Sequence, residues 1–220
     1  MSNLEKYRSL LTDVDALLLT GRVNRMYAAQ YGIAEGVCVI TRDEAFYFTD
    51  GRYIEAAQNN LEGFTALIVD REHPYTDRIN DVIAKYTVKT LGFEEAELTY
   101  AEYQRYSAKL HAVLVPYQDK LDAPRAAKEP WELERMRAAQ KVTDKVFAEL
   151  LDVIHAGMTE KELEAELIYR LYKYGAEEPS FDPIVVSGPN TSLPHGVAGQ
   201  RELAYGDFVT MDFGARVDGY

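Results

Sequence analysis

The stretch "GDFVTMDFGARVDGY", residues 206–220, decides the fold of the C-terminal half of this chain. Strand-forming residues fill it, and alternation along a strand spanning 207–217 predicts one apolar face made of Val209, Met211, Phe213 and Ala215. Asp212 falls on the opposite face. A lone carboxylate is costly to bury without a partner, so this placement indicates that Asp212 points away from the core.

The dipeptide Asp218-Gly219 predicts a two-residue hairpin turn, because both central residues of such a turn take positive φ. This register pairs Val217 with Tyr220 and sets Gly214 opposite a residue just beyond the sequence. A carboxylate there would lie diagonally from Asp212, with Cα atoms about 7–8 Å apart. Two such carboxylates could hold metal ions ~3.5–4 Å apart. The residues alone equally allow a strand-end Asp212 bonded to nearby backbone N–H groups.

His195 lies in "SGPNTSLPHGVAG", residues 187–199, a polar loop between two predicted strands. An imidazole titrates near pH ~6.5 and suits proton transfer near neutrality, and the neighbouring glycine lets a ligand approach closely. A solvated loop histidine is the competing interpretation. His73, His111 and His155 have no second ligand at metal-binding spacing, and we assign them no function.

Composition excludes several classes of partner. The 36 acidic and 24 basic residues give a net charge of −12, which disfavours nucleic acid and anionic membrane surfaces. The only cysteine, Cys38, lies in the apolar run "GVCVI" and can form no internal disulfide, which predicts a buried thiol and a reducing compartment. No apolar run approaches ~18 residues and no leader is visible, so we expect a cytoplasmic protein without a membrane partner.

The N-terminal half alternates short apolar runs with amphipathic segments from about Asp15 to Tyr117. The predicted strands are 15–20, 36–41, 45–49, 64–69, 88–93 and 112–117, and the predicted helices are 51–61, 75–86 and 98–110. Thr99 and Glu102 have the spacing of a capping box at the start of the last helix. This alternation predicts an α/β domain with a mixed sheet.

A different pattern begins near Pro124. One long helix is predicted over 130–154, and a second starts at Thr159 with Glu162 completing a capping box and ends before Gly175. Strands follow at 183–188 and 207–217. A charged, proline-bracketed stretch at 121–129 places the expected boundary between a domain at 1–124 and a second at 125–220.

Several motifs together resemble the creatinase/prolidase family of pita-bread metallopeptidases, in the branch of bacterial Xaa-Pro aminopeptidases and dipeptidases. They are Asn24-Arg25 with Tyr27, "FTDGRY" at 48–53, "PRAAKEPWELERMRAA" at 124–139, "GMTEKELEAEL" at 157–167, "SFDPIVVSGPNTSLPH" at 180–195 and the final stretch at 206–220. The resemblance covers the whole chain. It implies an N-terminal creatinase-like mixed-sheet α/β domain followed by the first part of an α+β pita-bread catalytic domain.

The resemblance implies a metal-dependent exopeptidase that removes the residue before proline by means of a water activated by two divalent ions. Asp212 would be the first metal ligand, and His195 would contact the substrate and stabilise the tetrahedral intermediate as a catalytic residue. Manganese is the expected metal and cobalt the other option, with the remaining ligands beyond residue 220. The 220-residue chain alone is then expected to be inactive. Proline-containing peptides and a second copy, forming a homodimer, are the implied partners.

Two alternatives stay open. One is a metal-independent creatinase-like amidinohydrolase that uses His195, and the other is a non-catalytic fragment for dimerisation or peptide binding. The chain has "YAAQYG" at 27–32 where many relatives have "YLTGF", which puts a substrate role of that loop in doubt. For Arg25, Arg52 and Tyr53 we favour packing and turn formation over catalysis. We also expect residues 1–120 to fold independently, and residues 125–220 alone to be poorly ordered or associated with another chain.

Overall fold

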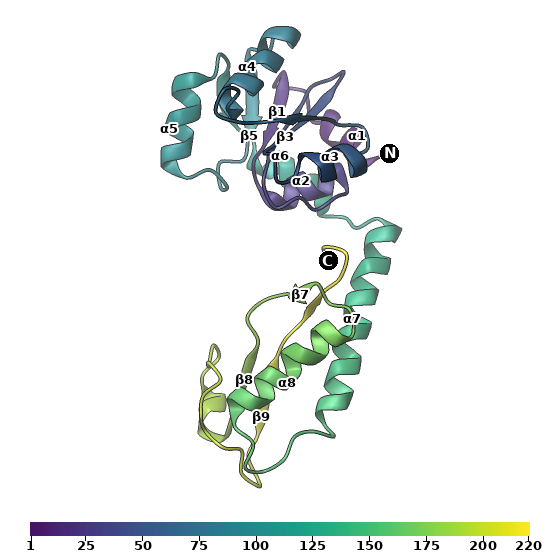
Figure 1. The fold of residues 1–220 in the computed structure, drawn as a ribbon, viewed down its shortest axis with the longest axis vertical. Coiled ribbons are helices and arrows are strands. Elements are labelled where there is room, and N and C mark those ends of the chain that lie inside the picture. Colours follow the sequence, from purple (N-terminus) through teal and green to yellow (C-terminus); the bar gives the residue numbers. More distant parts are fainter. The chain divides into compact units, whose positions relative to one another are not determined.

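The structure, a computed structural model, describes residues 1–220 and divides into two compact units, Met1–Ala127 (unit 1) and Lys128–Tyr220 (unit 2) (Figure 1). No helix of the chain combines the length and the apolar character needed to cross a bilayer. Each unit has its own hydrophobic core, so each is described by itself.

Unit 1 is built on a six-stranded mixed sheet in the order β4-β3-β2-β1-β5-β6. β1 pairs antiparallel with β2 and β2 with β3, whereas β3–β4, β1–β5 and β5–β6 are parallel pairs. All six predicted strands are confirmed, with slightly shorter bounds: β1 Ala16–Leu19, β2 Val37–Ile40, β3 Ala45–Thr49, β4 Thr65–Ile68, β5 Thr90–Phe93 and β6 Val113–Pro116.

The central strands of this sheet are buried on both faces. Ala16 and Leu18 of β1 pack in one cluster with Ile79 of α4, while Leu17 and Leu19 lie on the opposite face and are equally inaccessible to solvent. Cys38 of β2 is a free, buried thiol, and burial raises its pKa far above the ordinary range. The continuous apolar runs read from the sequence therefore have the pattern of doubly covered strands.

Six helices surround the sheet: α1 Asn3–Arg8, α2 Arg22–Ala29, α3 Ile54–Asn60, α4 Tyr75–Tyr86, α5 Tyr100–Lys109 and α6 Gln118–Asp122, the last followed by a 3₁₀ turn, Ala123–Arg125. The predicted helices correspond to α3, α4 and α5. The capping box of α5 is confirmed, since Thr99 Oγ1 accepts from Glu102 N at 3.3 Å and Glu102 Oε2 accepts from Thr99 N at 2.9 Å.

The sequence prediction missed α1, α2 and α6. For α2 the reason is visible, because Gly21 at its start offers no capping side chain. Glu94, distant in sequence, instead accepts from Thr20 N at 2.5 Å, Gly21 N at 2.7 Å and Asn24 Nδ2 at 2.8 Å. Local sequence contains no trace of this partner.

Arg25 of α2 has the packing role that the sequence analysis favoured. It is 4% exposed, and its guanidinium donates to the carbonyl oxygens of residues 20, 33 and 34 and to Tyr47 Oη at 2.6 Å. Arg52 is exposed and forms an ion pair with Asp50 at 2.6 Å across a turn. Both arginines belong to the architecture of unit 1.

Unit 2 consists of two helices and a long, interrupted hairpin. The helices are α7 Pro130–Leu150 and α8 Glu160–Lys173. β8 Ile184–Ser187 pairs antiparallel with β9 Val209–Asp212, and β7 Glu178–Pro179 pairs with β10 Ala215–Arg216. A 3₁₀ segment, η2 Gly188–Ser192, follows β8. Apolar residues of α7, α8 and β8, among them Val146, Leu163, Leu167 and Val185, form the core.

Two predicted elements of unit 2 need correction. The helix predicted to reach residue 154 ends at Leu150, where Asp152 N and Val153 N donate three residues back, to Glu149 O at 3.3 Å and Leu150 O at 3.0 Å. The single strand predicted over 207–217 is divided into β9 and β10 at residues 213–214. The second helix starts as predicted, with a capping box between Thr159 and Glu162.

Candidate active site

Unit 2 contains a cavity of about 720 Å³ that brings Asp212 and His195 together. α8 contributes Lys161, Glu164 and Ile168 to its wall, and the segment leading into β8 contributes residues 181–184. Lys161 and Glu164 form an ion pair with each other. The two residues singled out from the sequence, 17 positions apart along the chain, thus face one shared space.

Asp212 is the last residue of β9 and lies opposite Ile184 of β8. Alternation along the strand is confirmed, since Val209 and Met211 pack against the core while Asp212 is exposed. The following turn is confirmed as well: Asp218 and Gly219 have φ of 49° and 81°. Val217 and Tyr220 exchange both backbone hydrogen bonds, at 2.7 and 3.0 Å.

The interruption between β9 and β10 is a bulge that shapes the cavity. Residues 180–183 on one strand oppose only residues 213–214 on the other, so the longer side loops outward. Phe181 and Asp182 come from this looped segment and line the cavity. A Cβ at Gly214 would come within 2.3 Å of the Ser180 hydroxyl, so a side chain there would force Ser180 to change rotamer. Sequence analysis did not identify Asp182.

His195 occupies the tip of a tight turn. Gly196 N donates to Leu193 O at 3.1 Å, which places Pro194 and His195 at the two central positions. His195 is exposed, whereas Gly196 is buried against β8, where an added Cβ would come within 2.7 Å of Val186 Cγ1. The turn therefore seats its backbone on the strand and presents the imidazole outward.

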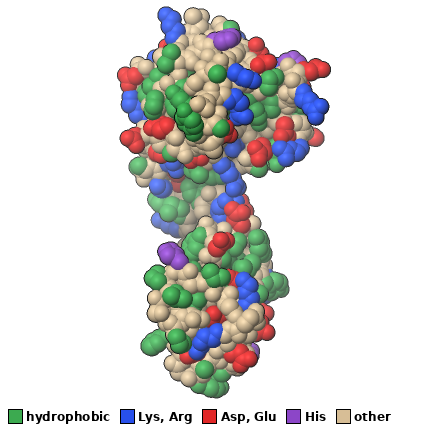
Figure 2. Space-filling model, turned by 90° about the vertical axis from the view of Figure 1, so that its left-hand side faces the viewer, with side chains coloured by type: hydrophobic (Ala, Val, Ile, Leu, Met, Phe, Trp, Pro, Cys, Tyr) green, Lys and Arg blue, Asp and Glu red, His purple; other side chains and the backbone are tan.

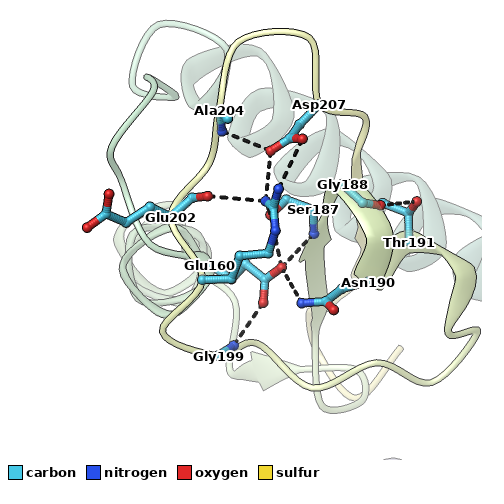
Figure 3. Close-up of polar contacts among 10 residues, drawn as sticks. Glu160, Ser187, Gly188, Asn190, Thr191, Gly199, Glu202, Ala204 and Asp207 are labelled. Carbon is cyan, nitrogen blue, oxygen red and sulfur yellow. Dashed lines mark hydrogen bonds and ion pairs between the residues drawn. The ribbon is translucent and has the colours of Figure 1, made fainter.

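Hydrogen bonds fix the two ends of the His195 loop to the body of unit 2 (Figure 3). The Glu160 carboxylate, at the start of α8, accepts from Ser187 N at 2.7 Å, Asn190 Nδ2 at 3.0 Å and Gly199 N at 3.1 Å. Burial opposes ionisation of Glu160, but these hydrogen bonds outweigh it and lower the carboxyl pKa. Sequence analysis identified the helix start at Thr159 and not this residue.

The donor atoms of the cavity suit part of a metal site. Carboxylate oxygens and imidazole nitrogens are ligands for manganese, cobalt or zinc, and Asp212 and Asp182 present carboxylates to the same space. No group of three or more His, Cys, Asp or Glu side chains within residues 1–220 is close enough together to hold an ion. Asp212 therefore fits the role of one carboxylate ligand in a coordination shell that these residues do not complete.

Two models of known protein families match successive parts of this chain. The model of the creatinase/prolidase N-terminal domain matches residues 5–127, and the model of metallopeptidase family M24 matches residues 134–220. The first match alone covers more than half of the sequence. This chain belongs to the creatinase/prolidase family of metallopeptidases, and the fold expected from its motifs is confirmed.

Curated relatives and solved structures agree with this placement. Uncharacterized peptidase YqhT of Bacillus subtilis is 36% identical over 99% of this chain and 62% of its own length. The structure of the Xaa-Pro dipeptidase from Bacillus anthracis matches with a TM-score of 0.93 and 33% identity, over 99% of this chain and 61% of that one. The X-Pro aminopeptidase from Thermotoga maritima matches with a TM-score of 0.88 and 28% identity, over 99% and 62%. The chain thus spans about three fifths of the length of these relatives.

Proposed function

We propose that the intact protein is a metal-dependent exopeptidase that cleaves the bond between an N-terminal residue and proline. One observation carries the proposal: Asp212 and His195, supplied by separate segments of the M24 match, line the same cavity. Relatives named as Xaa-Pro dipeptidases and X-Pro aminopeptidases support the substrate class.

In the proposed mechanism, Asp212, at the end of β9, would be one carboxylate ligand of a divalent ion. Two such ions would supply a water of lowered pKa and polarise the scissile carbonyl. The exposed imidazole of His195 donates a hydrogen bond to the substrate oxygen as negative charge develops on it. Phe181 and Ile184 give the cavity an apolar side that contacts the peptide and excludes water. Hard carboxylate ligands favour manganese, with cobalt as the second option.

We further propose that the protein works as a homodimer in the cytoplasm. A buried, unpaired thiol at Cys38 suits a reducing compartment. The net charge of −12 supports a peptide substrate over nucleic acid or an anionic lipid surface.

The test is release of the first residue from a short Xaa-Pro peptide by the intact protein, with manganese and after chelation. Asp212→Asn should lower kcat/KM by roughly 10³-fold or more and reduce the bound metal, because it removes a charged ligand. His195→Ala should lower kcat by about 10²–10³-fold with unchanged metal content. Asp152→Asn, an exposed carboxylate at the end of α7, is the control and should leave both readouts unaltered.

Wild-type protein that releases nothing with any divalent ion would refute the proposal. Hydrolysis of an amidine substrate that survives chelation would instead identify the metal-independent amidinohydrolase. Asp212→Asn with full activity would remove the assigned role of Asp212.

A further inference from the structure

We propose that Glu160 is a positioning residue that holds His195 in its working place. This inference rests on the proposed function only in giving His195 a catalytic task. The mechanical part stands on the contacts of residues 187–207 alone, and it concerns a side chain that does not line the cavity.

Glu160, at the start of α8, is buried and accepts several hydrogen bonds. Its side chain is 0% exposed, although glutamate is seldom fully buried without partners. One carboxylate oxygen accepts from Ser187 N, Ser187 Oγ and Asn190 Nδ2 at 2.7, 2.9 and 3.0 Å, and the other accepts from Gly199 N at 3.1 Å. Glu160 thereby grips the loop on both sides of His195, five residues before it at Asn190 and four residues after it at Gly199.

The backbone of α8 reinforces this grip. Glu160 N donates to Arg201 O and Lys161 N donates to Gly199 O, each at 3.0 Å. These N–H groups belong to the first turn of α8, where a helix has no partners of its own. The returning arm of the His195 loop therefore accepts from the first two N–H groups of the helix, beside the capping box of Thr159. The side chain and the backbone of Glu160 thus contact the same segment.

An ion pair between Arg201 and Asp207 closes the base of the loop. Arg201 donates to Ser187 Oγ at 2.5 Å and to both oxygens of Asp207, at 2.7 and 3.1 Å. Asp207 also accepts from Ala204 N at 2.8 Å. Figure 3 shows Ser187, Ala204 and Asp207 around this network. A Cβ at Gly188, where φ is +50°, would come within 2.5 Å of Arg201 Nη2 and 2.7 Å of Asp207 Oδ1.

The loop thus has two ends held by hydrogen bonds, at 187–190 and 199–207, which form its frame, and an exposed tip at 193–197 that carries His195. Ser187, Gly196 and Ala198 are buried, whereas Leu193 and Val197, on either side of His195, are 55% and 82% exposed. The backbone of the tip rests on β8 at Gly196, beside Val186, whereas the side chains of Leu193, His195 and Val197 are exposed. The frame determines where the imidazole lies, and Glu160 is the group that joins its two arms.

The negative charge of Glu160 is what the site requires. A carboxylate accepts at both oxygens, whereas a glutamine amide would turn N–H groups toward either Gly199 N or the Ser187–Asn190 donors. Glu160→Gln keeps the size of the side chain and breaks one of the two arms. Glu162→Gln is the matched control, because Glu162 lies two positions further along α8 and accepts only from Thr159 N and Oγ1, at 2.8 and 2.9 Å.

The experiment compares these variants in the intact protein, with and without manganese. The first readout is the ¹H–¹³C signal of the His195 ring in metal-free protein labelled with ¹³C-histidine, assigned with His195→Ala. Glu160→Gln should shift and broaden this signal, and Glu162→Gln should leave it in place. The second readout is kinetics with manganese: Glu160→Gln should lower kcat by roughly 10²-fold, as expected for a displaced catalytic group, with unchanged bound metal.

Asn190→Ala serves as a milder second variant if Glu160→Gln does not fold, because it removes one hydrogen bond to the same carboxylate. It should shift the His195 signal in the same direction by a smaller amount. A His195 signal that is identical in wild type, Glu160→Gln and Asn190→Ala overturns the inference. Equal shifts in Glu160→Gln and Glu162→Gln overturn it too, since they would show a general loss of helix stability. A protein inactive toward Xaa-Pro peptides refutes the proposed function, while the ring signal still decides whether Glu160 positions His195.

Discussion

Unit 1 buries most of its large apolar side chains, whereas unit 2 leaves more of its own exposed to solvent. In unit 1 the strands β1 and β2 are buried along their whole length, while β9 of unit 2 alternates between half-buried and exposed residues. Eleven of the 17 exposed large hydrophobic side chains belong to the smaller unit 2. Figure 2 shows hydrophobic side chains, in green, at the surface of both units. Unit 1 therefore has a core that covers its own strands, whereas the exposed apolar side chains of unit 2 belong to the unit that contains the candidate site.

The same contrast appears in one buried glutamate of each unit. Glu94 in unit 1 and Glu160 in unit 2 are 1% and 0% exposed and both accept hydrogen bonds near a helix start. Burial outweighs the hydrogen bonds of Glu94 and raises its pKa, whereas the hydrogen bonds outweigh burial at Glu160 and lower its pKa. Glu94 secures a helix of the scaffold, and Glu160 secures a loop beside the cavity.

The largest expected effect comes from separating the units. A fragment of residues 1–127 should unfold cooperatively on heating, with coincident far-UV circular dichroism and tyrosine fluorescence transitions. A fragment of residues 128–220 should lack a cooperative transition or associate, because its strand edges and exposed apolar side chains have no cover. A monomeric 128–220 fragment with a sharp transition would erase the contrast between the units.

A smaller effect should distinguish the two glutamates by pH. Each Glu→Gln change should lower the free energy of unfolding near neutral pH by about 1–3 kcal/mol where it leaves buried donors unpaired. At Glu94, the advantage of wild type over Glu94→Gln should shrink as pH rises above the ordinary carboxyl value of 4.5, because there the folded state retains a proton that the unfolded state has lost.

At Glu160 the sign is opposite. The advantage of wild type over Glu160→Gln should be present above the ordinary value and be lost as pH falls through the lower folded pKa, since protonation then breaks the accepted hydrogen bonds. Urea unfolding of wild type and both variants between pH 3 and 7, a range around the ordinary carboxyl pKa of about 4, measures both differences. Parallel pH curves for the two sites would contradict the assignment of opposite shifts.

The smallest effect concerns the ends of two helices. α4 ends at Thr87 with φ of 54°, and α8 is followed by Gly175 with φ of 94°. A β-branched residue in the left-handed region is strained, so Thr87→Gly should raise the free energy of unfolding by about 0.5–1 kcal/mol. Gly175→Ala should lower it by about 1 kcal/mol for the converse reason. Thermal melts of both variants provide the measurement, and a destabilised Thr87→Gly would show that the strain is negligible.

Much of the scaffold was predictable because its signals are local. The strands of unit 1 follow from short apolar runs, and the starts of α5 and α8 follow from capping boxes four residues long. α2 was missed because its start depends on Glu94, which follows the distant strand β5, and no window around Gly21 contains that information. The break at residues 213–214 was missed for a similar reason, since a bulge is a property of two strands and the alternation was read on one.

The candidate site was predictable as far as single residues carry a recognisable motif. Strand alternation and the Asp218-Gly219 turn placed Asp212 and its hairpin, and the polar loop pointed to His195. Asp182 needed the bulge to bring it to the cavity. Glu160 needed the three-dimensional contact with residues 187–199, because in sequence it is one of several charged residues on an ordinary amphipathic helix.

The burial of Cys38 makes it practical to measure the motion of the His195 loop, residues 187–199, with a thiol-attached probe. Its thiol lies in the middle of the sheet of unit 1 with a strongly raised pKa, so thiol-directed reagents at neutral pH would leave it unmodified. Within residues 1–220, a cysteine introduced by Val197→Cys, at a position 82% exposed, would then carry a spin label or fluorophore without removal of the native thiol. Such a probe, two residues from His195, would report the loop's motion on the nanosecond timescale in the working protein.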